Sequence, residues 1–278
     1  IVRGIPSVQY GDLTSGLVKV KRTKGGNFLS ARFKADMDSK LFYLAKAFEW
    51  QSKKLSLNLS ADYLDNKAEP RNQLETYQRI TLSARLNKQW NTETMRYNAS
   101  LNVDYGGSFD NDKVDPEFNH GGIDKYKSTY NRYATSFLFA INSKNNQTFF
   151  TNGELSASFS YERNRLERTK LVQLDGDTPA ATTMTNGESD AVLISPYKYT
   201  ATHTVDGKPI SVYLKANANF TLPIKGLSNT MLVGTDYQMD RNLGEGQMFD
   251  RLHPVYTGAS YRPRRYADIP ASQTLAAY

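Results

Sequence analysis

The side chains best able to do chemistry lie outside the regularly patterned parts of the chain, and they are scattered. The three histidines, His120, His203 and His253, stand singly in three long stretches. Their spacing does not define a metal site, because a zinc site needs three or four ligands brought together. We interpret them as exposed loop residues and predict no bound metal.

A second candidate is an acidic stretch. Residues 110–115 (Asp-Asn-Asp-Lys-Val-Asp) resemble a sparse calcium loop, but they lack the central glycine and the terminal glutamate of an EF-hand. A solvated loop is the favoured interpretation, and calcium binding there stays open. The chain has no cysteine, which excludes disulfides and thiolate metal sites.

A third candidate is basic and aromatic. It could contact an anionic or sugar-like ligand, lipopolysaccharide or a partner protein, and it could equally be a solvated loop. The cluster consists of Tyr261, Arg262, Arg264, Arg265 and Tyr266.

Motifs for catalysis are missing from the sequence. It contains no Gly-x-Ser-x-Gly elbow, no His-Glu-x-x-His motif and no Walker loop. We therefore predict that the chain has no catalytic residues, is not an enzyme and needs no cofactor. The enzyme alternative is a ten-stranded barrel protease, which would need His and Asp facing each other near the outer rim.

The composition narrows the class of protein. The 278 residues include 35 Lys and Arg against 28 Asp and Glu, a formal net charge of +7. This excess is mild and does not by itself indicate a nucleic-acid partner, which we do not expect. No apolar run approaches the roughly 20 residues of a membrane helix. A membrane β-barrel stays open, because its lipid-facing residues alternate with polar ones.

The strongest pattern in the sequence has a period of two. In Leu55–Tyr63 and Met95–Tyr105 every second residue is apolar or aromatic and the residues between are polar. Such alternation predicts strands with one apolar and one polar face. At about ten residues they suit a bilayer better than a typical globular sheet. The other predicted strands are Leu29–Met37, Leu41–Trp50 (with ambiguous facing), Ile80–Asn87, Tyr133–Ile141, Leu155–Tyr161, Val212–Leu222 and Met231–Met239, with a tenth beginning at Thr274.

The predicted polar faces and connections favour a barrel over a soluble sandwich. Residues such as Asn58, Asp62 and Arg96 would be costly to bury dry, but they suit a wet lumen. The connections alternate in length, so short turns gather at one end and long loops at the other, as in outer-membrane barrels. Six tyrosines near strand ends fit interfacial belts. The short connections are 89–94, 143–150 and 223–229; the long ones are 107–128, 163–209 and 241–273; the tyrosines are Tyr63, Tyr97, Tyr105, Tyr133, Tyr161 and Tyr237.

A motif precedes the first strand. Residues 2–16 read Val-Arg-Gly-Ile-Pro-Ser-Val-Gln-Tyr-Gly-Asp-Leu-Thr-Ser-Gly, followed by the strand-like 17–21. This stretch resembles the C-terminal end of the plug of TonB-dependent outer-membrane transporters, Bacteroidetes type. Ser15 stands where the commoner family form has glycine. The matching residues are Arg3, Gly4, Pro6, Tyr10, Gly11 and Gly16.

This resemblance implies a fold and a domain division. The expected fold is all-β: part of a transmembrane antiparallel barrel of about 22 strands, with the end of an N-terminal plug. Residues 1–25 would end the plug, and residues 26–278 would form the first nine to ten barrel strands. Since nine full strands cannot close an even-numbered barrel, we expect the native protein to be longer.

The resemblance also implies a function. The family imports a scarce nutrient across the outer membrane of a Gram-negative bacterium, and the TonB complex moves the plug. Expected partners are that complex, lipid and lipopolysaccharide, a siderophore, cobalamin, glycan or peptide substrate, and a surface lipoprotein acting as a lid. The family further suggests a latch between Arg3 and a lumen carboxylate of the wall. Candidate carboxylates are Glu75, Glu154 and Glu162.

Three other functions stay open. The first is a receptor-like barrel that serves as a scaffold or docking partner for a surface lipoprotein or a secretion complex. The second is a passive porin, which the plug motif disfavours. The third is a soluble β-sandwich.

Overall fold

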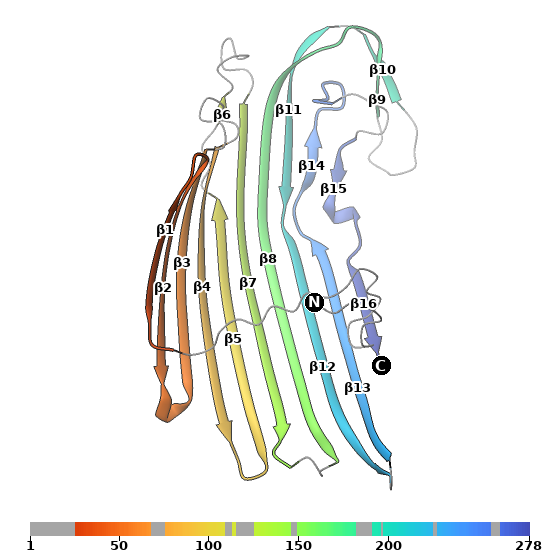
Figure 1. Ribbon diagram of the computed structural model, residues 1–278. Helices are drawn as coiled ribbons and strands as arrows, with labels where there is room; N and C mark the ends of the chain where they lie inside the picture. The colour runs from red at the N-terminus through yellow and green to blue at the C-terminus, as the bar shows by residue number, and fades with distance from the viewer. Residues whose placement is uncertain are drawn as a thin grey trace.

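The computed structural model shows an all-β chain whose strand pairings are all antiparallel (Figure 1). It describes residues 26–67, 76–108, 113–114, 125–145, 149–181, 191–195, 197–224, 227–256 and 262–278. The described elements are β1 Leu29–Ala35, β2 Ser39–Trp50, η2 Gln51–Lys53, β3 Leu55–Lys67, β4 Thr76–Asn91, β5 Met95–Ser108, β6 Lys113–Val114, β7 Lys125–Ser143, β8 Phe150–Gln173, β9 Thr178–Ala181, β10 Ala191–Ile194, β11 Lys198–Gly207, β12 Pro209–Ile224, β13 Leu227–Asn242, β14 Gly246–Phe249, β15 Arg264–Arg265, η4 Tyr266–Asp268 and β16 Ser272–Ala277.

One fourteen-stranded sheet dominates, and β9 and β10 form a separate two-stranded sheet. One half of the long strand β8 pairs with β12 and the other half with β11. Only Lys208 separates β11 from β12, so they continue one another. With β11 and β12 counted as one, the predicted strands are confirmed: ten run side by side, in the order β1, β2, β3, β4, β5, β7, β8, β11/β12, β13 and β16.

The two ends of the sheet differ as the loop lengths predicted. At one end, the turn end, the connections are 51–54, 92–94, 144–149 and 225–226, all short. At the other, the loop end, the segments between successive strands of the ten-strand order are longer: 68–75, 109–124, 174–197 and 243–271. One connection departs from this rule, since β1 and β2 are joined at the loop end by only 36–38. Figure 1 shows the short turns below and the longer segments above.

The strand register places apolar residues opposite apolar residues on one face. A single row runs across the sheet through Leu57, Leu86, Leu101, Phe137, Ala157 and Leu214. The same register settles β2, whose facing the sequence left ambiguous. Phe42, Leu44, Phe48 and Trp50 lie on the apolar face because their partners in β3 do.

Several sequence-based boundaries are wrong: β4 and β7 are longer than predicted, and residues 241–273, expected to form a loop, contain β14 and β15. Residues 163–209 were expected to form a long loop, but β8 continues to Gln173 and β11 begins at Lys198. Alternation fails to predict residues 164–173 because neither face of that segment is uniformly apolar. The first strand ends at Ala35, before Met37. There Asp36 Oδ1 accepts hydrogen bonds from the Ser39 backbone N–H at 2.6 Å and the Ser39 hydroxyl at 2.9 Å, which begins the turn.

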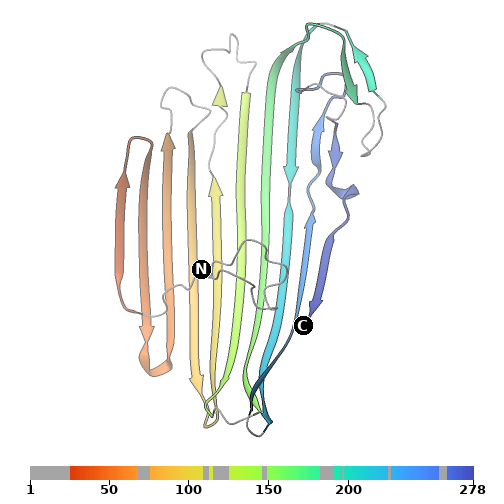
Figure 2. The same cartoon turned by 45° about the vertical axis from the view of Figure 1, so that its right-hand side comes forward.

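The sheet is curved, and its two faces are buried to different extents. Figures 1 and 2 show β1 and β2 nearly edge-on in one view and opened out in the other. Buried residues on the polar face include Ala47, Ser56 and Ser100, whereas Leu59 and Leu155 on the apolar face are exposed. This difference indicates that the polar face is concave, where side chains converge. Within the described residues β1 pairs only with β2 and β16 only with β13.

Candidate functional site

The apolar face carries two rows of aromatic rings, and the first lies toward the loop end. Tyr133 stands between two other tyrosines, with ring centroids 5.0 Å from Tyr105 and 6.4 Å from Tyr161. Nearer the β1 edge, Phe33 and Phe42 are 4.8 Å apart. These residues come from five different strands, and the register brings them to similar heights.

The second row lies toward the turn end. The Trp90 ring stacks on Tyr97 at 5.4 Å and contacts Phe139 at 6.0 Å. On β2, Phe48 and Trp50 stack at 6.1 Å. Further across the sheet, Phe220 lies 5.0 Å from Phe149 and 5.9 Å from Phe150. The two rows therefore bound the apolar face at both ends of the strands.

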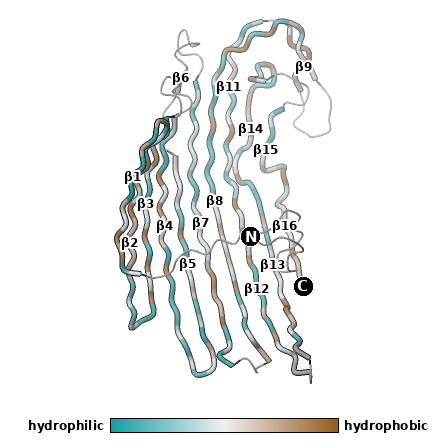
Figure 3. Tube along the Cα trace, in the orientation of Figure 1, coloured by the Kyte–Doolittle hydropathy of each residue, from teal (hydrophilic) through white to brown (hydrophobic). Residues whose placement is uncertain are grey.

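Between the two aromatic rows the face is largely aliphatic and exposed. Leu82, Val103, Leu155 and Leu214 are 42–46% exposed. In β5 the segment from Tyr97 to Tyr105 spans nine residues, the length that a tilted strand needs to cross a bilayer's hydrocarbon core. Figure 3 shows the alternation of hydrophobic and hydrophilic residues along these strands.

The polar face is held by hydrogen bonds between neighbouring strands. Ser100 Oγ donates to Asn87 Oδ1 at 2.8 Å, and Asn102 Nδ2 donates to Ser136 Oγ at 3.0 Å. Ser83 also donates to Asp104 across β4 and β5. Water can replace such contacts, so this face suits a hydrated space better than a dry core.

The structure describes two of the three candidate latch carboxylates. Glu154 and Glu162 both lie on the polar face of β8, as expected. The Glu162 carboxylate pairs with the Arg132 guanidinium on β7, at 3.3 Å between Oε1 and Nε. Arg3, Glu75 and the other residues of the plug motif lie outside the described residues, as does the whole segment 1–25. The domain division and the latch stay predictions.

Above the aromatic rows the loop end builds a small core of its own. Residues 164–173, 198–207 and 246–256 are here called the loop-end extension. In Figure 1 the upper parts of β8 and β11 rise past the other strands, and β14 pairs with β11. The Tyr199 hydroxyl donates to the Pro254 carbonyl oxygen at 2.7 Å, which ties the segment after β14 onto β11. Its buried cluster consists of Val172, Leu174, Ile194, Tyr199, Ala201 and Val255.

The sequence contains a signal for strand β11 that the sequence analysis missed. Buried and exposed residues alternate there: Tyr199, Ala201 and His203 are buried, and Lys198, Thr200 and Thr202 are exposed.

Two histidines belong to this extension, and one of them corrects an expectation. His203 is buried on β11 and not an exposed loop residue. Burial, helped by the nearby charge of Arg168, lowers the pKa of His203. His253 lies beside Asp250, with 2.5 Å between Nδ1 and Oδ2, and this hydrogen bond lowers the pKa of Asp250. His120 lies outside the described residues.

The basic cluster is split rather than gathered. Arg262 is buried, and its carbonyl oxygen accepts from Gln247 Nε2 at 3.4 Å. Arg264 and Arg265 form the exposed strand β15 against β14, and Tyr266 begins η4. Tyr261 lies outside the described residues. Arg264 and Arg265 are thus the residues of this cluster best exposed to a ligand or partner.

Two negative findings apply to the described part of the chain. It contains no group of three or more His, Asp or Glu side chains placed to hold a metal ion. None of its helices is long and apolar enough to cross a membrane. The acidic stretch 110–115 falls almost wholly outside these residues, so its calcium binding stays open. Searches against protein-family models and against curated proteins find no match to this chain.

Proposed function

We propose that this chain forms part of the wall of an outer-membrane β-barrel that imports a scarce nutrient with energy from the TonB complex. The observation that carries the membrane part is the apolar face bounded by two aromatic rows. In water, an exposed face of this size would favour aggregation. In a bilayer it is the expected surface, with aromatic belts at the two interfaces and an aliphatic band between them.

The polar face supports a lumen. Its Ser and Asn side chains bond across neighbouring strands, as expected of a polar inner wall. The connections are short at one end of the sheet and long at the other. This difference supports an orientation in the membrane, because outer-membrane barrels keep short turns in the periplasm and long loops outside. Import itself rests on the resemblance of residues 2–16 to the end of a transporter plug.

The first experiment is fractionation of the native protein followed by electrophoresis of heated and unheated samples. We expect an outer-membrane protein that migrates differently after heating. The resemblance to plugged receptors predicts about three times the 31.4 kDa of this chain. A stable, water-soluble species near 31.4 kDa would overturn the proposal.

A latch at Arg3 is the second test. Arg3→Glu should impair uptake while the barrel still assembles, because polar contacts hold a plug that must also move. Since Glu162 already pairs with Arg132, Glu75 and Glu154 are the better partners to test by charge reversal. Unchanged uptake in Arg3→Glu would remove the latch from the proposal.

The loop-end extension favours one alternative, a barrel that serves as a scaffold or docking partner for a surface lipoprotein or secretion complex. Its own buried cluster makes it a preformed surface beyond the aromatic rows. Uptake that stops when the proton gradient is collapsed supports transport. A barrel that binds a lipoprotein, with no uptake of any candidate nutrient, supports the scaffold.

A further inference from the structure

One cation interrupts the apolar face. Lys46 lies on β2 between Leu44 and Phe48, and its register partners are Leu29 on β1 and Leu59 on β3. The other lysines on this face of β2 and β4 lie at strand ends. Lys40 is next to the first residue of β2, and Lys88 reaches the turn, where its Nζ donates to the Lys53 carbonyl oxygen at 2.7 Å. Among the described strands, Lys46 is therefore the one charged residue that lies on the apolar face between the two aromatic rows.

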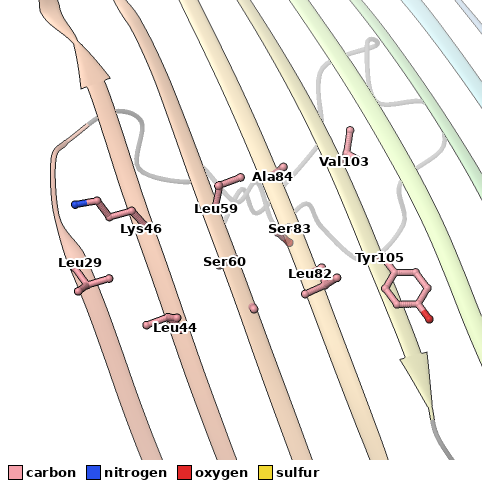
Figure 4. A pocket seen from close by; sticks show the side chains of 11 residues that line it. Leu29, Leu44, Lys46, Leu59, Ser60, Leu82, Ser83, Ala84, Val103 and Tyr105 are labelled. Carbon is pink, nitrogen blue, oxygen red and sulfur yellow. The ribbon is translucent and has the colours of Figure 1, made fainter.

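The side chain of Lys46 extends over β1, and its ammonium lies close to the turn-end row (Figure 4). Its Nζ lies 5.4 Å from the centroid of the Phe48 ring, and Phe48 stacks on Trp50. A cation is attracted to the face of an aromatic ring, and long basic side chains in membranes extend toward the interface. The ammonium thus approaches the level at which lipid headgroups begin.

A groove adjoins this lysine. It has a volume of about 430 Å³ and is lined mainly by Leu29, Leu44, Leu59, Leu82, Val103 and Tyr105, with Lys46 at its β1 side. Figure 4 shows the leucines along β1 to β4 and the ammonium extending past Leu29. An apolar groove with a single cation at its margin is complementary to a molecule that has a hydrocarbon chain and a negatively charged head.

We propose that this groove binds an acyl chain of an anionic phospholipid whose phosphate pairs with Lys46. The inference rests on the proposed membrane location and adds a specific lipid site to it. Phospholipid is the chosen source because the Lys46 ammonium lies beside Phe48 of the turn-end row, and the turn end faces the periplasm in outer-membrane barrels. Lipopolysaccharide occupies the opposite leaflet.

The two tryptophans lie in different parts of the sheet, so each reports on lipid binding in its own surroundings. Trp50 stacks on Phe48 beside Lys46, whereas Trp90 contacts Tyr97 and Phe139 further across the sheet. The full-length protein, reconstituted in phosphatidylcholine vesicles, is titrated with phosphatidylglycerol carrying brominated acyl chains, which quench nearby indoles. In a background in which every tryptophan outside these 278 residues is replaced by phenylalanine, Trp90→Phe reports on Trp50 alone, and Trp50→Phe reports on Trp90 alone.

A single lysine near a bilayer surface strengthens binding of an anionic lipid by about fivefold. We therefore expect Trp50 to be quenched at about one fifth of the phosphatidylglycerol fraction that Trp90 requires. Lys46→Gln should abolish this preference and Lys46→Arg should keep it. Lys40→Gln, on the same strand and face, is the matched control and should leave the preference unchanged.

The outcomes separate the two proposals. If brominated phosphatidylcholine quenches both tryptophans equally and phosphatidylglycerol shows no preference for Trp50, the lipid site is wrong and the membrane location stands. If brominated phosphatidylcholine quenches neither, the membrane location itself fails. Competition by lipopolysaccharide but not by phosphatidylglycerol would overturn the proposal and make lipopolysaccharide the ligand of the groove. Protection of Trp50 that rises with protein concentration would overturn it as well, and would make a second copy of the chain the occupant.

Discussion

The two halves of β8 (Phe150–Gln173) are built for different surroundings. In residues 150–161 the large apolar side chains Leu155 and Phe159 point outward and stay exposed. In residues 164–173 the apolar side chain of Val172 turns to the concave side and joins the buried cluster with Tyr199 and Val255.

Under the proposed membrane location, this difference corresponds to the solvent that each half would meet. Each half of β8 pairs with a neighbouring strand, residues 150–161 with β12 and residues 164–173 with β11, so backbone pairing does not distinguish them. The half with outward apolar side chains gains stability only where the outside is apolar as well. The other half gains it as a water-soluble protein does, by burying apolar area against itself. The change falls after Tyr161, where Arg163 and Arg165 follow on the outward face.

Loss of the internal core should have the largest effect. Tyr199→Ala removes a buried ring and its hydrogen bond to Pro254, and we expect a loss of about 3–5 kcal/mol in the local stability of the loop-end extension. Hydrogen exchange should speed up in β11 and β14, while β3 to β5 stay protected. Tyr197→Ala, at a side chain 39% exposed, is the control and should cost much less. Equal loss in both variants would contradict a distinct core.

A charge on the outward face tests the other half of the comparison. Leu101→Arg in the aliphatic band of β5 should lower the free energy of unfolding in lipid vesicles by about 2–4 kcal/mol. Asn102→Arg, the next residue but on the polar face, should cost only its hydrogen bond to Ser136, about 0.5–1.5 kcal/mol. Urea unfolding followed by tryptophan fluorescence measures both. If the two substitutions cost the same, the apolar face does not meet lipid.

A tight backbone contact joins the two regions. Gly244 lies between β13 and β14, and a Cβ there would press on the carbonyl group of Asp206. We expect Gly244→Ala to destabilise the loop-end extension by about 1–3 kcal/mol, because backbone atoms must shift to make room. Gly176→Ala is the control, since a Cβ at that position would meet no other atom within 4 Å. Proteolysis kinetics of folded protein would reveal the difference.

The pH response should be the smallest effect, and confined to the same extension. Because burial lowers the pKa of His203, the unfolded chain binds a proton more readily than the folded one. The contribution of His203 is therefore fully present above its unfolded pKa of about 6.5 and is lost as the pH falls toward the folded pKa. Thermal unfolding of the extension at pH 7.5 and 5.5 should show this loss, and His203→Phe should reduce it. A pH response unchanged in that variant would assign it to other groups.

The apolar face could be predicted from the sequence wherever alternation of apolar and polar residues governs a whole strand. The outward face of β3 and β5 follows from alternation alone, because each residue there meets either an apolar or a polar environment. Where β8 leaves that band, neither of its faces is uniformly apolar, so the rule misassigned residues 164–173 as a loop. In β11 the alternation is present, but its buried face meets a local core. The buried Arg262 was unpredictable for a related reason, since its surroundings come from β14 in another part of the sequence.

By itself the sequence determined that the chain is all-β, which face of most strands is apolar, and that short turns and long loops gather at opposite ends. These are local properties, set by side-chain alternation and by the residues between strands. Only the tertiary structure decided that the aromatic side chains of separate strands align in rows, that Lys46 faces a groove of leucines, and that His203 is buried. Each of these depends on register, and register is a relation between distant segments that no single strand encodes.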